Sequence, residues 1–157
     1  AESDSSHLIH TLDKLELAFL GDERPLNRED IESVVVEDIV QNYFLIVENV
    51  AMGNISKTIK EFRNYAIGQQ NFSSLLAFLS RYFKNMQNIR SKVDTRVPYF
   101  GKAKEKFENH LKLWPKGKIE KVINLIFDTN IELREKSAIK HSVKMERMLM
   151  NICSLIK

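Results

Sequence analysis

Residues 72–92 read FSSLLAFLSRYFKNMQNIRSK, and they predict the longest helix of the chain. Apolar side chains recur along this stretch at the three- and four-residue spacing of a helix face. They are Leu75, Leu76, Leu79, Tyr82, Phe83, Met86 and Ile89. Because such a stripe buries its apolar surface only against other helices, we expect this segment to be the spine of a helical core.

Helical spacing continues on both sides of the spine, interrupted by isolated glycines and prolines, and the short alternating runs of β-strands are missing from the sequence. The further predicted helices span residues 6–20, 28–35, 39–52, 55–67, 102–113, 115–136 and 142–157. The predicted fold class is therefore all-α: a helical bundle with a short two-helix appendage at its N-terminal end.

The same spacing assigns side chains to the core. Phe44 and Phe127 are expected to face inward with the other apolar residues of their helices. The single cysteine, Cys153, lies among apolar residues of the last predicted helix, where a thiol packs as a small apolar side chain. A lone buried thiol is typical of a reducing compartment, so we expect a cytoplasmic location.

Charge is distributed unevenly along the chain. Residues 1–52 carry 3 basic and 12 acidic side chains, a net charge of −9, whereas residues 53–157 carry 21 and 9, a net of +12. The asymmetry indicates contacts with nucleic acid or an acidic protein, or else two solvated surfaces of opposite sign. The sequence has neither a signal-peptide pattern nor the run of roughly 18 apolar residues that a membrane span needs, so we expect no membrane association.

The residue patterns of common catalytic and cofactor sites are missing from the sequence. A phosphate-binding loop needs clustered glycines, whereas those of this chain are isolated: Gly21, Gly53, Gly68, Gly101 and Gly117. The histidines do not have the spacing of metal ligands: His7, His10, His110 and His141. No Gly-x-Ser-x-Gly sequence marks a nucleophile. We therefore expect no catalytic residue, no metal site and no cofactor.

Residues 96–102, RVPYFGK, form an aromatic and basic connector between two predicted helices. Aromatic rings and arginine supply much of the binding energy in protein interfaces. The interface candidates in and after this connector are Arg96, Tyr99, Phe100, Lys102 and Trp114. Two other interpretations stay open: the same residues suit stacking on unpaired nucleic-acid bases, and the aromatic side chains suit plugging one end of the bundle.

A second local pattern pairs Glu132 with Lys136 at i,i+4 spacing in the penultimate predicted helix. The acidic residue precedes the basic one, which is the better orientation on a helix. As an exposed pair it contributes only a few tenths of a kcal/mol, and alone it says nothing about function.

Taken in order, these features resemble the delta subunits of bacterial DNA polymerase III clamp loaders. Residues 12–18, LDKLELA, are similar to the family's E-L-E-K-L-A-L helix, and residues 25–35 are similar to I-T-x-E-D-V-x-x-L-V. The further matches are residues 44–53 with F-x-L-V-D-A-I-L-x-G-D, residues 96–102 with R-P-P-x-x-F-K-R, Trp114 before a helix, and residues 132–136 with E-x-x-x-K. The resemblance covers essentially all 157 residues and lies in the order and spacing of the motifs.

The resemblance implies two domains and a non-catalytic role. Residues 1–37 would be the end of an AAA+-like lid domain, and residues 38–157 a helical collar domain that serves oligomerisation. The family's ATPase-like domain, through which the subunit contacts the sliding clamp, is expected before Ala1. The chain would then be part of a DNA-directed DNA polymerase holoenzyme, a nucleotidyltransferase complex, without activity of its own.

The resemblance also implies partners and site residues. The partners are the other clamp-loader subunits, of the tau/gamma and delta-prime types, and primed DNA in the assembled complex. Subunit-interface roles fall to Arg96, Tyr99, Phe100, Lys102, Trp114, Glu132 and Lys136. DNA-proximal roles fall to Lys140, His141 and Lys144.

Two alternative functions follow from the same sequence. One is the collar domain of another clamp-loader subunit. The other is a stand-alone basic helical module that binds nucleic acid, which the net charge of +12 over residues 53–157 favours. Salt dependence separates the second alternative from an apolar subunit interface, because phosphate contacts weaken steeply as salt rises.

Overall fold

The computed structural model describes residues 12, 13, 28 and 42–157. The chain separates into two compact units, residues 1–42 and residues 43–157. The predicted helices over residues 6–20 and 28–35 lie outside the described residues, apart from the helical residues 12, 13 and 28. The fold below is that of the second unit.

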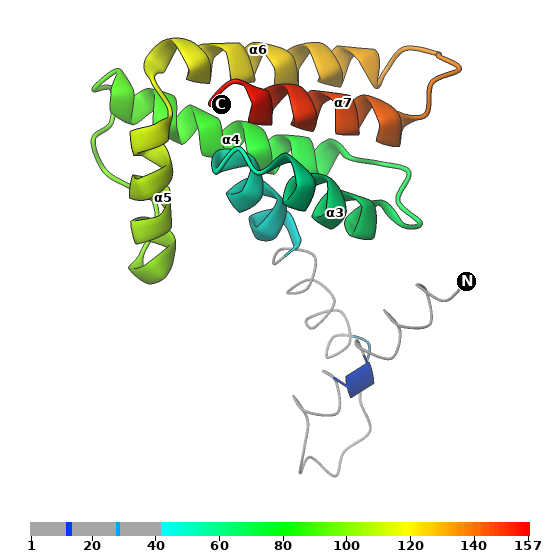
Figure 1. The fold of residues 1–157 in the computed structure, drawn as a ribbon, viewed down its shortest axis with the longest axis horizontal. Helices are drawn as coiled ribbons and strands as arrows, with labels where there is room; N and C mark the ends of the chain where they lie inside the picture. The colour runs from blue at the N-terminus through cyan, green and yellow to red at the C-terminus, as the bar shows by residue number, and fades with distance from the viewer. Residues whose placement is uncertain (1–11, 14–27, 29–41) are drawn as a thin grey trace. The chain divides into compact units, whose positions relative to one another are not determined.

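This unit is built from helices alone among the residues that the structure describes (Figure 1). A helix over residues 42–51 precedes α3 (Ile55–Ala66), α4 (Ser73–Arg90), α5 (Gly101–Leu113), α6 (Lys116–Glu132) and α7 (His141–Ser154). The predicted all-α helical bundle is confirmed for this part of the chain. None of these helices is long and apolar enough to cross a membrane.

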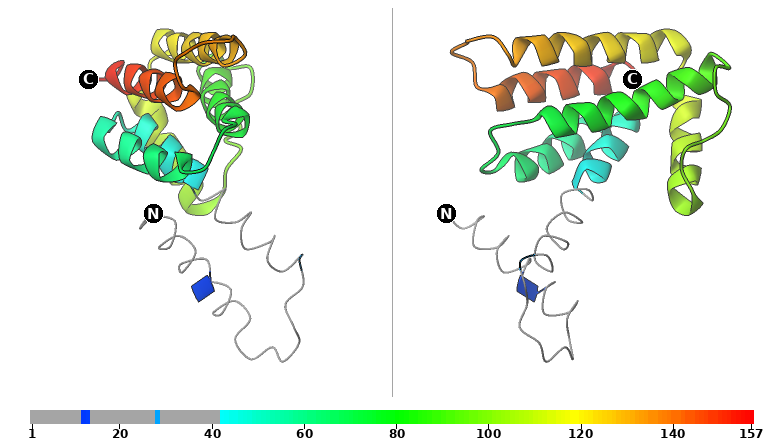
Figure 2. Two further views of the ribbon diagram at one scale, coloured as in Figure 1. Left: turned by 90° about the vertical axis from the view of Figure 1, so that its right-hand side faces the viewer. Right: turned by 180° about the vertical axis from the view of Figure 1, so that it is seen from behind.

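The predicted spine, α4, is one of the helices that surround the core of the bundle and supplies much of that core (Figure 2). Six of its apolar side chains are buried: Leu75, Leu76, Leu79, Tyr82, Phe83 and Met86. It packs most extensively against α6, while α3 packs against α7, and α6 and α7 pack against each other. These four helices run roughly along one another, whereas α5 crosses one end of the group (Figures 1 and 2). Each fully buried large apolar side chain contributes about 1.5–3 kcal/mol relative to an exposed one.

The buried thiol predicted for Cys153 is confirmed. Cys153 is fully buried, and its Sγ lies 3.5 Å from the Thr58 hydroxyl of α3. Burial raises the pKa of the thiol, and the Thr58 hydrogen bond only partly opposes this effect. The side chain is therefore a neutral packing element between α3 and α7, without the thiolate that reactivity requires.

Two side chains expected in the core lie at the surface. Phe44 is exposed, although its ring packs edge-on to Phe78 at 5.0 Å between centroids, and Phe127 is 63% exposed. The helix over residues 42–51 instead buries Ile46, which lies on the same side as Val47 and Val50. Periodicity gave the right helices there, but the direction of the core is set by neighbouring helices.

The penultimate helix is shorter than expected. α6 ends at Glu132, so the prediction that this helix continues to residue 136 is wrong. The Nζ of Lys144 in α7 donates a hydrogen bond to the Glu132 carbonyl oxygen at 2.6 Å, which occupies one of the free carbonyls at the helix end. Lys136 therefore lies in the α6–α7 loop, and it cannot form a helical i,i+4 pair with Glu132.

Candidate functional site: the connector and α5

Residues 91–100 connect α4 to α5 and carry the most exposed apolar side chains of the unit. Val93 is 76% exposed and Phe100 is 89% exposed. Arg96 is also exposed: its backbone N–H donates to Asp94 Oδ1 at 3.0 Å, and its Nε lies 3.5 Å from the same oxygen. Because this ion pair is largely solvated, it contributes little to stability. The guanidinium group stays accessible to a partner.

Tyr99 faces the opposite way from its neighbour Phe100. Its ring centroid lies 5.0 Å from that of Phe107 in α5 and 5.7 Å from that of Tyr82 in α4. The Asn85 side-chain amide donates to its hydroxyl at 3.2 Å. Successive side chains of an extended segment point to opposite sides, so anchoring Tyr99 against the bundle directs Phe100 into solvent.

α5 is held against the bundle by a few specific contacts. Phe107 and His110 are its two buried residues. The Tyr82 hydroxyl and His110 Nδ1 are 2.6 Å apart, and burial lowers the pKa of His110, so the imidazole is neutral at pH 7. On the exposed side, Lys106 Nζ lies 2.9 Å from Glu48 Oε1, and Arg90 donates to the Leu111 carbonyl oxygen.

Trp114, directly after α5, lies in the core. It is fully buried, and its indole N–H donates to the Ala51 carbonyl oxygen at 2.8 Å. Its ring packs edge-on to Phe83, with centroids 5.0 Å apart. Trp114 and Tyr99 thus pack into the end of the bundle, as the plug interpretation predicts. Arg96, Phe100 and Lys102 are exposed and accessible to a partner.

The segment that contains Phe100 is basic. Residues 90–118 contain nine basic side chains and three acidic ones, a net charge of +6. The basic residues are Arg90, Lys92, Arg96, Lys102, Lys104, Lys106, Lys112, Lys116 and Lys118. An exposed aromatic ring within a positively charged segment suits an anionic partner.

The other predicted site residues lie at the far end of the bundle. Glu132, Lys136, Lys140 and His141 are exposed where α6 passes through a loop into α7, opposite the end that α5 crosses (Figure 1). Lys144 is buried, with its ammonium group on the Glu132 carbonyl. The structure therefore divides the predicted residues into two separate groups, and Lys144 has a structural contact where a DNA contact was expected.

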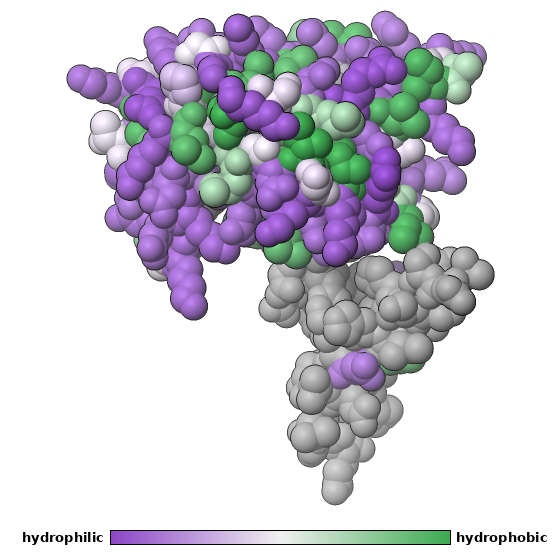
Figure 3. All heavy atoms as spheres, in the orientation of Figure 1, coloured by the Kyte–Doolittle hydropathy of each residue, from purple (hydrophilic) through white to green (hydrophobic). Residues whose placement is uncertain are grey.

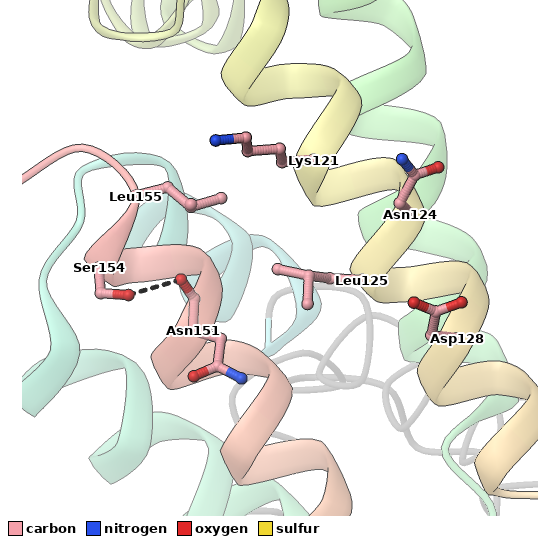
Figure 4. Close-up of a pocket in the computed structure, with 7 residues that line it drawn as sticks. All are labelled: Lys121, Asn124, Leu125, Asp128, Asn151, Ser154 and Leu155. Carbon is pink, nitrogen blue, oxygen red and sulfur yellow. Dashed lines mark hydrogen bonds between the residues drawn. The ribbon is translucent and has the colours of Figure 1, made fainter.

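A shallow groove of about 450 Å³ runs between α6 and α7 (Figure 4). Its lining residues are Lys121, Asn124, Leu125, Asp128, Asn151, Ser154 and Leu155. Asp128 is the one carboxylate in this lining, and Ser154 Oγ donates to the Asn151 carbonyl oxygen at 2.8 Å. A single carboxylate and two amides form neither a general acid–base pair nor an activated nucleophile.

Comparison with known proteins identifies no relative of this chain. No family model, curated protein or solved structure matches the chain. Among residues 12, 13, 28 and 42–157, no three His, Cys, Asp or Glu side chains gather closely enough to hold a metal ion. A functional assignment therefore rests on the surface of the bundle and on the sequence motifs.

Three side chains that organise this surface could not be recognised from sequence patterns. Spacing predicts only that Tyr82 is buried, and nothing in the spacing of His110 indicates a partner, yet the two form the buried hydrogen bond between α4 and α5. Asn85 holds the Tyr99 hydroxyl from α4. These partners are 28 and 14 residues apart in the chain, so local periodicity carries no information about them.

Proposed function

We propose that this chain is the helical, non-catalytic assembly domain of the delta subunit of a bacterial DNA polymerase III clamp loader. The resemblance of the ordered motifs from residue 12 to residue 136 supports this family. The bundle supports a binding role, because residues on its surface offer apolar and aromatic contacts. In this proposal the partners are tau/gamma-type and delta-prime-type subunits in the cytoplasm, and clamp opening belongs to a preceding domain.

The observation that carries the proposal is that large apolar side chains are exposed on helices whose other side already forms the core. On α6 and α7 these are Phe127, Ile131, Val143 and Met150, each at least 44% exposed. Hydrophobic residues also gather across the middle of the face over α7, framed by hydrophilic ones (Figure 3). Contiguous exposed apolar surface rimmed by polar residues is typical of protein-binding sites.

The test is a binding experiment with purified loader subunits. The chain is expected to be retained by tau/gamma-type or delta-prime-type subunits, to leave the sliding clamp unbound, and to hydrolyse no ATP. Replacing Phe127 and Ile131 together by serine is expected to weaken retention at least tenfold, since interface anchors contribute more than about 1 kcal/mol each. Ala77→Ser, on the exposed side of α4, is the matched surface control.

Two results would contradict this assignment. Retention of the clamp or turnover of ATP would show activities that belong to the preceding domain in the family. If no loader subunit bound the chain, the proposed role in loader assembly would be wrong.

A second candidate function is a basic helical module that binds nucleic acid. The net charge of +6 over residues 90–118, together with the exposed ring of Phe100, favours it. Such a module would bind single-stranded DNA through phosphate contacts and stacking. The logarithm of its binding constant would fall linearly with the logarithm of salt concentration. An assembly domain by itself is expected to bind no tighter than the range of about 10⁻⁴ to 10⁻⁶ M typical of non-specific contacts at physiological salt.

Fluorescence anisotropy with a primed template separates the two functions. Nanomolar binding with a steep salt dependence, lost in Phe100→Ala, would favour the nucleic-acid module. Weak binding that Phe100→Ala leaves unchanged favours the assembly domain. Phe100 is suited to this comparison because its ring is too exposed to matter for folding.

A further inference from the structure

α5 joins the rest of the unit through one compact cluster of rings, here called the aromatic clasp. The clasp consists of Tyr82 from α4, Tyr99 from the connector, and Phe107 and His110 from α5. Phe107 lies edge-on to Tyr82 at 5.2 Å between centroids and 5.0 Å from Tyr99. Outside the clasp, α5 packs the partly buried Leu111 against the core and forms exposed contacts such as Lys106 to Glu48, which contribute little individually.

His110 is the one member of the clasp that changes charge between pH 5 and pH 8. It is 3% exposed, and its Nδ1 shares a 2.6 Å hydrogen bond with the Tyr82 hydroxyl. The charged groups that act on it are Glu48 from the helix over residues 42–51, which raises its pKa, and Lys106 from α5, which lowers it. Since these two are paired with each other, neither leaves an uncompensated charge to stabilise a buried imidazolium.

We propose that His110 is a proton-operated latch that holds α5 and the connector against α4 when neutral and releases them when protonated. A buried imidazolium would have to be desolvated inside a cluster of three aromatic rings, and opening the clasp returns it to water. The remaining helices keep their own core, because α3, α4, α6 and α7 pack on one another without α5. The opening is therefore local.

Trp114 sets the limit of the moving segment. Its ring is buried against Phe83 and its N–H is bonded to the Ala51 carbonyl, so the chain is fixed again immediately after α5. The moving part is thus residues 91–113, which include exposed Phe100 and Arg96. Protonation of His110 would change the position of that surface whichever partner it binds, so the latch does not depend on the proposed function.

Hydrogen exchange of the full chain, followed by mass spectrometry from pH 8 to pH 5 and corrected for intrinsic exchange, measures the latch. Protection of the α5 amides is expected to fall about tenfold for each unit by which folding depresses the pKa of His110. Protection in α3, α6 and α7 and the emission of Trp114, the single tryptophan, are expected to stay unchanged. An NMR titration of the His110 ring should give the same midpoint as the α5 amides.

The variant His110→Asn removes the titration and keeps a polar atom near the position of Nδ1, so its α5 protection should not depend on pH. His141→Asn, at an exposed position of α7, is the matched control and should behave as the wild type. Tyr82→Phe keeps the ring but removes the hydrogen bond, and should lower α5 protection already at pH 8. The latch is ruled out if His110→Asn shows the wild-type fall, if His110 titrates without loss of α5 protection, or if Tyr82→Phe leaves protection at pH 8 unchanged.

Discussion

Tyr99 and Phe100 are adjacent aromatic residues with opposite surroundings. Tyr99 packs against Phe107 and bonds to Asn85, and its burial raises the pKa of its hydroxyl, whereas the ring of Phe100 is 89% exposed. Exposing a phenylalanine ring to water is unfavourable, and the exposed ring contributes no packing energy to the folded state. Phe100 is consequently the strongest single candidate for a partner contact, and Trp114, which lies in the core, is the weakest.

Truncation of these two residues should separate folding from binding. Trp114→Ala is expected to lower the free energy of unfolding by about 3–5 kcal/mol, because it opens a cavity beside Phe83 and removes the donor to the Ala51 carbonyl. Phe100→Ala should change it by less than about 0.5 kcal/mol. Urea unfolding followed by circular dichroism measures both, and equal effects of the two variants would contradict this placement.

Gly53 is required by both its backbone conformation and its surroundings. Its φ is +68°, and a Cβ there would lie 2.9 Å from Ile156 Cγ1 and 3.3 Å from the Cys153 carbonyl oxygen. Gly68 has a similar φ of +73° but open space around it. Gly53→Ala is therefore expected to destabilise by about 1–3 kcal/mol more than Gly68→Ala, since only the first adds a steric clash to the left-handed strain. Thermal unfolding of the pair tests this difference.

The end of α6 shows how a contact from another helix can determine where a helix stops. α6 ends at Glu132, where the ammonium group of Lys144 in α7 donates to the Glu132 carbonyl oxygen. This contact also explains how an ammonium group can lie in a largely apolar interface: its charge meets the negative end of the α6 dipole. Lys144, which the sequence resemblance predicts to lie near DNA, thus joins two helices.

Replacing Lys144 tests this structural role. Lys144→Met keeps the length of the side chain but removes the donor, and is expected to cost about 1–3 kcal/mol of unfolding free energy, the range for a lost hydrogen bond to a charged group. Lys140→Met, at an exposed position one turn earlier, should be nearly neutral. If the two variants were equally stable, the Glu132 contact would contribute nothing.

At the scale of the whole molecule, stability should be greatest between about pH 6.5 and pH 10, the ordinary pKa values of His and Tyr. Burial lowers the pKa of His110, so its stabilising contribution is complete above the unfolded value and is lost as pH falls. Burial raises the pKa of Tyr65 and Tyr82, so their contributions are complete below the unfolded value and are lost as pH rises.

Urea unfolding at pH 5, 7.5 and 10.5 measures this profile. His110→Asn is expected to flatten the acid side near pH 6. Tyr82→Phe is expected to make the alkaline decline shallower, with the remaining decline due to Tyr65. Acid instability that persists unchanged in His110→Asn would assign the acid side to carboxylates instead.

Sequence patterns alone were sufficient to predict the class of the fold and the main helices of the described bundle. Helical spacing predicted the buried stripe of α4, located the starts and most of the ends of α3 to α7 to within a few residues, and placed Cys153 in the core. These features are local: a stripe of apolar residues and a glycine or proline at its end specify a helix whatever surrounds it. The aromatic and basic connector was equally visible, because it depends on composition alone.

Which side of each helix is covered, and which distant residues meet, depend on tertiary packing. Phe127 lies outside and Ile46 inside because the neighbouring helices, absent from any local pattern, set the direction of the core. The pairs Tyr82 with His110 and Lys144 with Glu132 close loops of the chain through packing. Within the connector, Tyr99 is anchored by α4 and α5, and this directs Phe100 to solvent. The sequence therefore predicts which residue types form the site, whereas which of them are exposed depends on contacts with distant residues.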